Sequence, residues 1–202
     1  MAAPPTRKQA LTEIRRRDIL AAAIKVFGKK GFADTSVDDV AAAAKIAKGT
    51  LYLYFRSKED IYTTAVQQAI REIQALIAER VTASRGVREK LAVAISIRLE
   101  FWIDHQSLYR LLLTVGREQK HRRQTNNSLR VGHAGFVAIL QEGIAAGELA
   151  PQELDDIAWA ILDMIRGCNE RRLDHLTNNT PQQDAATITN IALQRLGLAQ
   201  TD

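Results

Sequence analysis

The chain has 202 residues, of which 46% are hydrophobic and 25% charged, as in an ordinary soluble globular protein that is large enough to bury a core. No stretch approaches the roughly 20 uninterrupted apolar residues of a membrane helix, and no apolar run follows the charged N-terminus as in a secretory signal. We therefore expect a cytoplasmic protein without a membrane partner. The single cysteine, Cys168, cannot form a disulfide within the chain and is expected to be a small buried side chain.

The net charge of +5 is concentrated in the first third of the sequence. Residues 1–60 contain 12 Lys or Arg against 7 Asp or Glu, whereas residues 61–202 contain 16 of each. A positive excess gathered in one segment points to a polyanion as the partner of that segment. The alternative is a solvated basic surface without a partner.

Helix-forming residues dominate the sequence. Alanine, leucine, glutamine, arginine and glutamate are abundant, and no proline occurs between Pro5 and Pro151. No run alternates apolar and polar residues with the β-branched enrichment of a strand. The sequence therefore predicts an all-α protein of about nine helices.

The first four predicted helices form a helix-turn-helix arrangement. Ser36 with Asp39, and Ser57 with Asp60, have the spacing of capping boxes that open helices, and Gly31 can end the helix before them. Two short helices joined by a tight turn and braced by a longer one are typical of DNA-binding domains. We assign residues 1–60 to this domain, and expect its helices and the long helix that follows at about 6–30, 36–44, 47–53 and 57–82.

Further helices are expected through the rest of the chain, residues 61–202. Gly147 and Pro151 mark one boundary, and Thr180 with Pro181 has the pattern of an N-cap followed by proline at the first helical position. The basic run at 117–127 is read as a solvated helix end and loop. The expected helices lie at about 86–103, 105–119, 124–146, 152–177 and 182–197.

The stretch "AKIAKGTLYLYFRSKED" (44–60) has a Lys-Gly-Thr sequence that invites comparison with a phosphate-binding loop. A Walker loop requires the order G-x-x-x-x-G-K-[ST] after a strand, and this stretch has neither. Ile46, Leu51 and Phe55 have the spacing of one buried face. The remaining side chains are donors of the kind that phosphates and base edges accept from: Lys48, Thr50, Tyr52, Tyr54, Arg56 and Lys58.

The segment "ILAAAIKVFGKKGFADTSVDDVAAAAKIAKGTLYLYFRSKEDIY" resembles the DNA-binding domain of the tetracycline-repressor (TetR) family of transcriptional regulators, over about residues 15–65. The resemblance implies that Ala47–Leu53 is the recognition helix in the major groove of double-stranded DNA. It also implies contacts to bases and backbone by Lys48, Gly49 and Thr50, contacts to phosphates or thymine methyl groups by Tyr52 and Tyr54, and phosphate contacts by Thr35, Ser36 and Lys58. For Tyr52 and Tyr54, a partly buried supporting role is the alternative.

Two positions depart from the family pattern. Lys45 stands at the turn where the family usually has glycine, and lysine is strained there if the turn needs a positive φ. Ala47 stands where serine or threonine is usual, and its side chain cannot cap the recognition helix, a loss of about 0.5–2 kcal/mol. These departures bear on DNA affinity rather than on the fold.

The last two predicted helices carry apolar stripes suited to dimerisation. Helix-turn-helix modules usually bind two half-sites as dimers, and the resemblance implies a four-helix interface made by two helices of each subunit. The alternative is that both stripes pack only within their own subunit. The expected interface residues are Ile157, Ile161, Ile165, Ile188, Ile191 and Leu196.

The middle of the chain is rich in aromatic residues. The resemblance implies an effector pocket for an unidentified small molecule among these helices, and an apolar cavity with a few polar groups is the usual small-molecule site. Packing of the aromatic residues in the core is the alternative, His105 also suits a surface position, and Asp163 is the best polar candidate. The candidate residues are Phe101, Trp102, His105, Tyr109, Phe136, Leu140, Trp159, Asp163 and Met164.

The sequence offers little support for catalysis. It has no H-E-x-x-H, paired cysteines or G-x-S-x-G, and its four histidines lack the spacing of metal ligands. We expect no catalytic residue, metal or cofactor, and a homodimeric repressor released from a palindromic operator by an effector. The alternatives are a sequence-neutral architectural DNA binder and a helical small-molecule-binding protein or enzyme.

Overall fold

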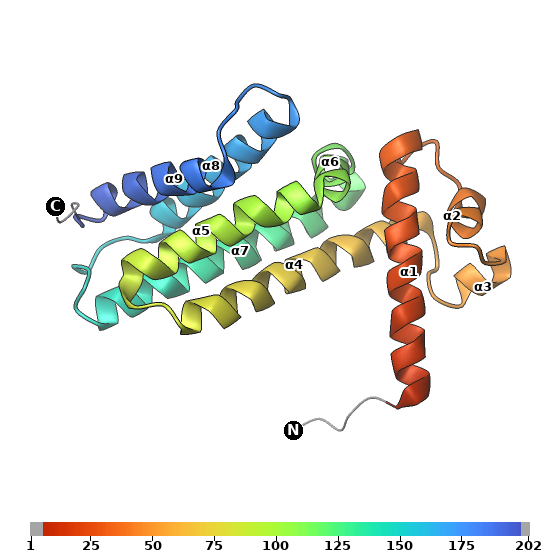
Figure 1. Ribbon diagram of the computed structural model, residues 1–202, viewed down its shortest axis with the longest axis horizontal. Helices are drawn as coiled ribbons and strands as arrows, with labels where there is room; N and C mark the ends of the chain where they lie inside the picture. Colours follow the sequence, from red (N-terminus) through yellow and green to blue (C-terminus); the bar gives the residue numbers. More distant parts are fainter. Residues whose placement is uncertain (1–5, 199–202) are drawn as a thin grey trace. The chain divides into compact units, whose positions relative to one another are not determined.

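The structure, a computed structural model, describes residues 6–198. Within these residues it has nine helices and no strand (Figure 1), which confirms the expected all-α fold. The helices are α1 (Arg7–Lys30), α2 (Val37–Ala43), α3 (Lys48–Tyr52), α4 (Lys58–Thr82), α5 (Gly86–Asp104), α6 (Gln106–Val115), α7 (Gln119–Ala145), α8 (Asp155–Leu173) and α9 (Pro181–Arg195).

Helix ends form where the local sequence signals them. The Ser36 hydroxyl accepts a hydrogen bond from the backbone N–H of Asp39, whose carboxylate accepts one from the Ser36 N–H, so the expected capping box opens α2. Thr180 caps α9 in the same way, with Pro181 at its start. Gly31 follows α1 with a φ of 84°, a conformation that favours glycine.

One expected loop is helical instead. The basic run 117–127 was expected to hold a helix end and a loop, but α7 begins at Gln119 and includes most of the run. Arg, Lys and Gln have good helix propensities, and His121 within the run is buried. This segment therefore has a buried side chain that supports the helix, in addition to its solvated ones.

The described residues form two compact units. The first comprises residues 6–69 together with 107–118, and the second comprises residues 70–106 together with 119–198. Helix α4 is continuous from Lys58 to Thr82, so it contributes to both units, and α6 belongs to the first.

The core of the first unit is built from α1, α2, α3 and α4. Ile19 of α1, Val40 of α2 and Leu51 of α3 are fully buried. The ring of Phe32 lies 5.0 Å from that of Phe27 and 5.7 Å from that of Tyr62 of α4. This core holds α2 against α1 and α3 against α2 (Figure 1).

In the second unit, α5 packs against α7, α8 and α9. Gly143 of α7 allows close approach to α5, because a Cβ at this position would lie 3.0 Å from the Cβ of Val87. An ion pair joins Arg172 of α8 to the buried Asp184 of α9. The Asp184 carboxylate also accepts a hydrogen bond of 3.0 Å from the Asn179 side chain, so this buried charge is fully partnered.

Candidate nucleic-acid interface

A tight turn joins α2 to α3. Lys45 in this turn has a φ of 56°, the strained conformation that was anticipated where glycine is usual. The Ile46 N–H donates to the carbonyl of Ala41 over 3.0 Å, which closes the turn. Ala47 is the N-cap of α3 and makes no side-chain capping bond, so α3 is held by packing of its buried residue Leu51.

The side of α3 away from the core is exposed. Lys48 and Gly49 lie on the surface, and Tyr52 is 48% exposed. A Cβ at Gly49 would meet nothing within 4 Å, so the fold itself does not require glycine there. Leu53 directly after α3 is 82% exposed, a position that the sequence reading missed and that an apolar contact to a thymine methyl group would suit.

Lys48 is partly neutralised by a neighbour on α2. Its ammonium lies 2.9 Å from a carboxylate oxygen of Asp38, and both side chains are exposed. The hydrogen bond from Lys48 to Asp38 and the attraction between their charges raise the pKa of Lys48. The pair orients the lysine along the surface shared by α2 and α3.

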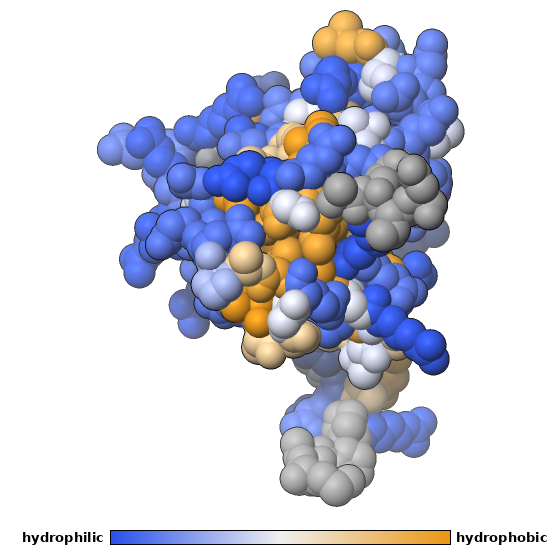
Figure 2. Space-filling model, turned by 90° about the vertical axis from the view of Figure 1, so that its left-hand side faces the viewer, coloured by the Kyte–Doolittle hydropathy of each residue, from blue (hydrophilic) through white to orange (hydrophobic). Residues whose placement is uncertain are grey.

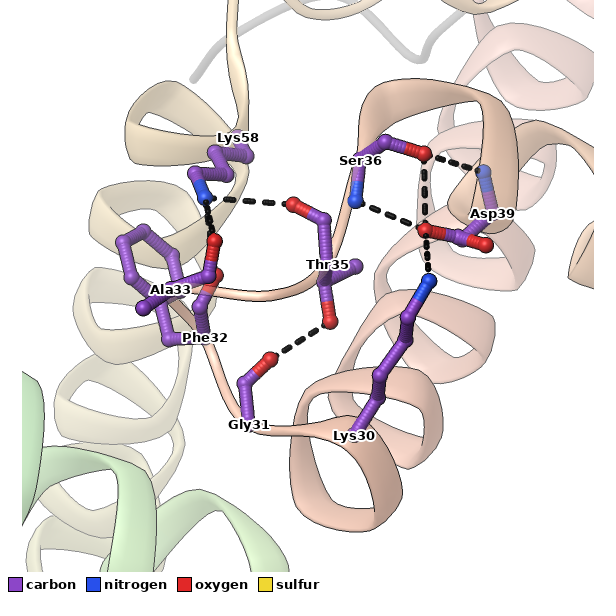
Figure 3. Close-up of polar contacts among 8 residues, drawn as sticks. All are labelled: Lys30, Gly31, Phe32, Ala33, Thr35, Ser36, Asp39 and Lys58. Atoms are coloured by element: carbon purple, nitrogen blue, oxygen red, sulfur yellow. Dashed lines mark hydrogen bonds and ion pairs between the residues drawn. The ribbon is translucent and has the colours of Figure 1, made fainter.

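The residues before α2 form a compact polar network (Figure 3). Thr35 is only 2% exposed, and its hydroxyl donates to the carbonyl of Gly31 over 2.6 Å. Ser36 is exposed and belongs to the capping box with Asp39, whose carboxylate also lies 2.7 Å from the ammonium of Lys30. Hydrogen bonds from Lys30 and Ser36 lower the pKa of Asp39 well below its usual range.

Lys58 points into the same network rather than into solvent. Its ammonium donates to the carbonyls of Phe32 and Ala33, each over 2.8 Å, and to that of Thr35 over 3.1 Å (Figure 3). The ammonium also lies 4.9 Å from the centre of the Phe32 ring. Since three backbone carbonyls already accept its hydrogen bonds, a phosphate contact by Lys58, expected from the resemblance, would require the side chain to leave these partners.

The segment after α3 is anchored to α1. Arg16 donates to the carbonyl of Tyr54 over 2.8 Å and lies 4.5 Å from the centre of the Phe55 ring. Tyr54 is half-buried and Phe55 is buried. At the start of α4, the Ser57 hydroxyl accepts from the Asp60 N–H over 3.1 Å, while the Asp60 carboxylate accepts from the Arg56 N–H.

Together these elements form a helix-turn-helix whose second helix exposes a cation, a glycine and an aromatic ring. Residues 19–65 match the family model described as bacterial regulatory proteins, tetR family. The helix-turn-helix segment of the chain belongs to the TetR family. The chain is a DNA-binding transcriptional regulator, as the sequence reading expected.

Relatives in sequence align with most of the chain. The fatty acid metabolism regulator protein of Bacillus subtilis is 28% identical over 180 residues, which cover 88% of this chain and 91% of that protein. The transcriptional repressor NicS of Pseudomonas putida is 25% identical over 142 residues, which cover 70% of this chain and 67% of NicS.

Solved structures show the same fold. The fatty acid degradation regulator FadR of Bacillus halodurans has a TM-score of 0.81 at 20% identity, covering 89% of this chain and 94% of that one. FadR of Bacillus subtilis in complex with stearoyl-CoA has a TM-score of 0.80 at 21% identity, covering 91% and 99%.

The structure separates the residues that were expected to line one TetR effector pocket. Phe101 packs edge-on against Trp102 at 5.3 Å and stacks on His105 at 4.0 Å. The rings of Phe101 and His105 border a groove of about 470 Å³ between α4 and α5. The groove is also lined by Leu76, Ile97 and the carboxylates of Glu72, Glu79, Glu100 and Asp104.

The other candidates lie elsewhere. Tyr109 is buried in the first unit, and Phe136 and Leu140 are buried on α7. On α8, Trp159 stacks on His133 at 4.4 Å and Met164 is half-buried.

Asp163 of α8 is exposed and lies 3.5 Å from the guanidinium of Arg166, so it does not point into an apolar interior.

Five of the six residues expected at the TetR dimer interface are buried within the chain itself: Ile157, Ile161, Ile165, Ile188 and Leu196. Ile191 of α9 is different, because it is 47% exposed. The stripes thus face the subunit's own core, which was the alternative reading, while Ile191 remains accessible. The interface itself stays a prediction.

Within residues 6–198, no group of three or more His, Cys, Asp or Glu side chains is arranged to hold a metal ion. No helix in the same range is long and apolar enough to cross a membrane. Cys168 is buried, and burial raises the pKa of its thiol.

Proposed function

We propose that the chain is a homodimeric repressor that binds a palindromic operator through α3 and releases it when a small molecule binds to the second unit. The exposed surface of α3 is the observation that carries this proposal. Lys48, Gly49 and Tyr52 are accessible, and a side chain at Gly49 would find open space. Such a surface allows close approach to the major groove, where bases are distinguished by their edges.

The proposed contacts fall into two groups. Lys48, Gly49, Thr50, Tyr52 and Leu53 belong to the base-facing segment. Ser36 and Tyr54 are proposed to contact phosphates at its border, together with Thr35, whose buried hydroxyl limits it to a backbone contact. Phosphate contacts fix the register of a protein on the duplex, whereas base contacts supply the specificity.

The dimer is proposed because one helix-turn-helix reads too few base pairs. Two half-sites lie about 34–36 Å apart on DNA, and a two-fold symmetric dimer matches a palindrome. Figure 2 shows apolar side chains gathered on one face and bordered by hydrophilic ones, and Ile191 of α9 is exposed. We propose that α8 and α9 meet their copies through Ile191 and its exposed neighbours.

We propose residues 1–60 as the DNA-binding domain and residues 61–202 as the effector-binding and dimerisation domain. Helix α4 runs across this division from Lys58 to Thr82. A ligand that changes the direction of α4 would therefore move the segment that carries α2 and α3. A long-chain acyl-CoA is the first effector to test, because a relative of the same fold was solved in complex with stearoyl-CoA.

The experiment begins with selection of operator sequences from random double-stranded DNA. The selected duplex is then titrated with the purified protein, with and without stearoyl-CoA, and binding is followed by fluorescence anisotropy. The proposal predicts a palindromic motif bound by two protomers and weaker binding when the effector is present. Salt-sensitive binding without a motif would instead support an architectural DNA binder, and absence of DNA binding would support a small-molecule-binding protein.

A further inference from the structure

Arg98 of α5 carries a charge into the interior of the second unit. The side chain is only 6% exposed, and its guanidinium lies 5.2 Å from the centre of the Phe136 ring on α7. Burial lowers its pKa to about 10, which leaves the guanidinium protonated at neutral pH. The interior of this unit therefore holds a positive charge.

This charge has no anionic partner in the part of the chain that the structure describes. Its Nε has no hydrogen-bond partner there, no carboxylate of residues 6–198 forms an ion pair with it, and burial is the only cause of its pKa shift. The buried Asp184 in the same unit shows the usual arrangement, because Arg172 forms an ion pair with it. A buried charge is normally paired, because removing it from water is costly.

A second unpartnered donor lies close to Arg98. The side-chain amide nitrogen of Gln74 on α4 is buried and makes no hydrogen bond within the described residues. A Cβ at Gly135 of α7 would lie 3.6 Å from Nη2 of Arg98, 3.8 Å from the side-chain oxygen of Gln74 and 3.9 Å from that amide nitrogen. Both donors thus converge on one helix position that has no side chain.

A second glycine lets Leu162 of α8 pack closely against α7 beside Arg98. A Cβ at Gly132, one turn before Gly135, would lie 3.7 Å from Nη1 of Arg98 and 3.2 Å from Leu162 of α8. The groups around the guanidinium are therefore the Gln74 amide, bare backbone and apolar side chains, none of which carries a negative charge. The missing component of this arrangement is an acceptor with negative charge.

We infer that Arg98 and Gln74 bind the anionic group, a carboxylate or a phosphate, of a small molecule with an apolar body. The guanidinium presents paired N–H donors that match either oxyanion, and the neighbouring Phe136 and Leu162 suit an apolar chain. The inference rests on the proposed effector function, since it names the chemistry of the ligand. It does not depend on which DNA sequence is bound.

The test measures ligand binding directly, by isothermal titration calorimetry of the full chain without DNA. The probes share an eight-carbon chain and differ in the head group: octanoate, octyl phosphate, 1-octanol and octyltrimethylammonium. We expect the unchanged protein to bind at least one of the two anions and to bind it more tightly than the alcohol or the cation. Comparison of octanoate with octyl phosphate then identifies the oxyanion.

Variants at Arg98 test the role of the charge. Arg98→Met should weaken binding of the preferred anion by roughly thirtyfold or more, because a desolvated charge pair is lost, and should leave 1-octanol binding unchanged. Arg98→Lys should retain part of the anion preference. Arg88→Met, on the exposed side of the same helix, is the matched control and should bind the anion as the unchanged protein does.

The thermal stability of the Arg98 variant distinguishes a ligand-binding role of Arg98 from a structural one. Without ligand, Arg98→Met should raise Tm, because it removes an unpaired buried charge, whereas a structural arginine would lower Tm when replaced. Gly135→Ala offers a second variant, since its methyl group would occupy the space between the two donors and weaken anion binding with the charge retained. Anion binding that is absent from the unchanged protein, or that survives Arg98→Met, would overturn the inference.

The outcome of the DNA-binding experiments is independent of the outcome of the anion-binding experiment. A protein that selects an operator but shows no Arg98-dependent anion binding would retain the proposed regulatory function and lose the inferred ligand class. A protein that binds octanoate or octyl phosphate through Arg98 but selects no operator would retain the ligand site and lose the proposed repressor function.

Discussion

The side chain of Lys58, in the first turn of α4, donates a hydrogen bond of 3.1 Å to the backbone carbonyl of Thr35, in the loop before α2. Two more carbonyls of the same loop, those of Phe32 and Ala33, accept from the same ammonium (Figure 3). One cation thus satisfies three backbone acceptors that precede α2. The connection ties the beginning of α4 directly to the segment that leads into the helix-turn-helix.

Replacement of this cation should loosen the first unit. Lys58→Met retains the length of the side chain but removes its donors, so we expect the free energy of unfolding to fall by about 1–3 kcal/mol. Urea denaturation measures the change. Lys25→Met on the exposed side of α1 is the control, and equal stability of the two variants would show that Lys58 is free to contact phosphate instead.

A substitution at Gly49 tests DNA binding separately from folding stability. An added methyl group would meet nothing within 4 Å, and alanine favours a helix over glycine by roughly 0.5–1 kcal/mol. We therefore expect Gly49→Ala to raise Tm slightly while weakening operator binding about tenfold, because the methyl group would stand between α3 and the bases. Thermal denaturation and fluorescence anisotropy measure the two effects.

The control for this variant is Gly167→Ala in α8, where the added methyl group would meet only the end of the Arg171 side chain. It should leave operator affinity unchanged. Unchanged operator affinity in Gly49→Ala as well would contradict the close approach of α3 to DNA.

Asp38 should weaken DNA binding by neutralising Lys48. The two side chains are exposed and lie 2.9 Å apart, so Asp38→Asn frees the lysine and removes a negative charge near the phosphates. We expect operator affinity to rise by roughly twofold to fivefold at low salt. Asp156→Asn, an exposed change of the same kind in α8, is the control. Weaker binding by the Asp38 variant would indicate that the pair orients Lys48 for base contact.

The network at α2 should make stability depend on acid pH. Lys30 and Ser36 lower the pKa of Asp39 below its ordinary value of 3.8, so the ionised carboxylate stabilises the fold at neutral pH. This contribution is lost as the pH falls below about 4 toward the folded-state pKa. Asp39→Asn should therefore be less stable than the unchanged chain at pH 7, with a difference that shrinks toward pH 3.

Urea denaturation at pH 7, 5 and 3.5 measures this difference, with Asp34→Asn in the neighbouring loop as the control. A deficit of Asp39→Asn that stays constant over this range would mean that the carboxylate acts through its shape alone.

Short sequence patterns at helix ends and turns predicted much of the fold. The capping box of Ser36 and Asp39 and the N-cap Thr180 depend on residues three positions apart, so the sequence alone reveals them. The strain at Lys45, which has a φ of 56°, and the missing cap at Ala47 were likewise foreseen. Each is a property of one turn of chain.

Contacts between distant segments were harder to foresee. Lys58 donates to carbonyls more than 20 positions away in the sequence. An apolar stripe in the sequence does not distinguish whether Ile161 packs in the core of its own subunit or against a partner. Asp163 illustrates the same limit, because a polar residue among apolar ones on a helix can point outward, as it does here. The sequence did not single out Arg98, because only the structure shows that this arginine is buried and has no ion-pair partner within the described residues.

The ratio of dissociation constants for the selected operator and for a scrambled duplex of equal length tests the central claim most directly. It should be measured by fluorescence anisotropy at fixed salt for the unchanged protein, Lys48→Ala and Tyr52→Ala. Sequence-specific recognition through α3 predicts a ratio of about 10³ or more for the unchanged protein and a clear fall in both variants. A ratio near one, or a large ratio that both variants retain, would contradict it.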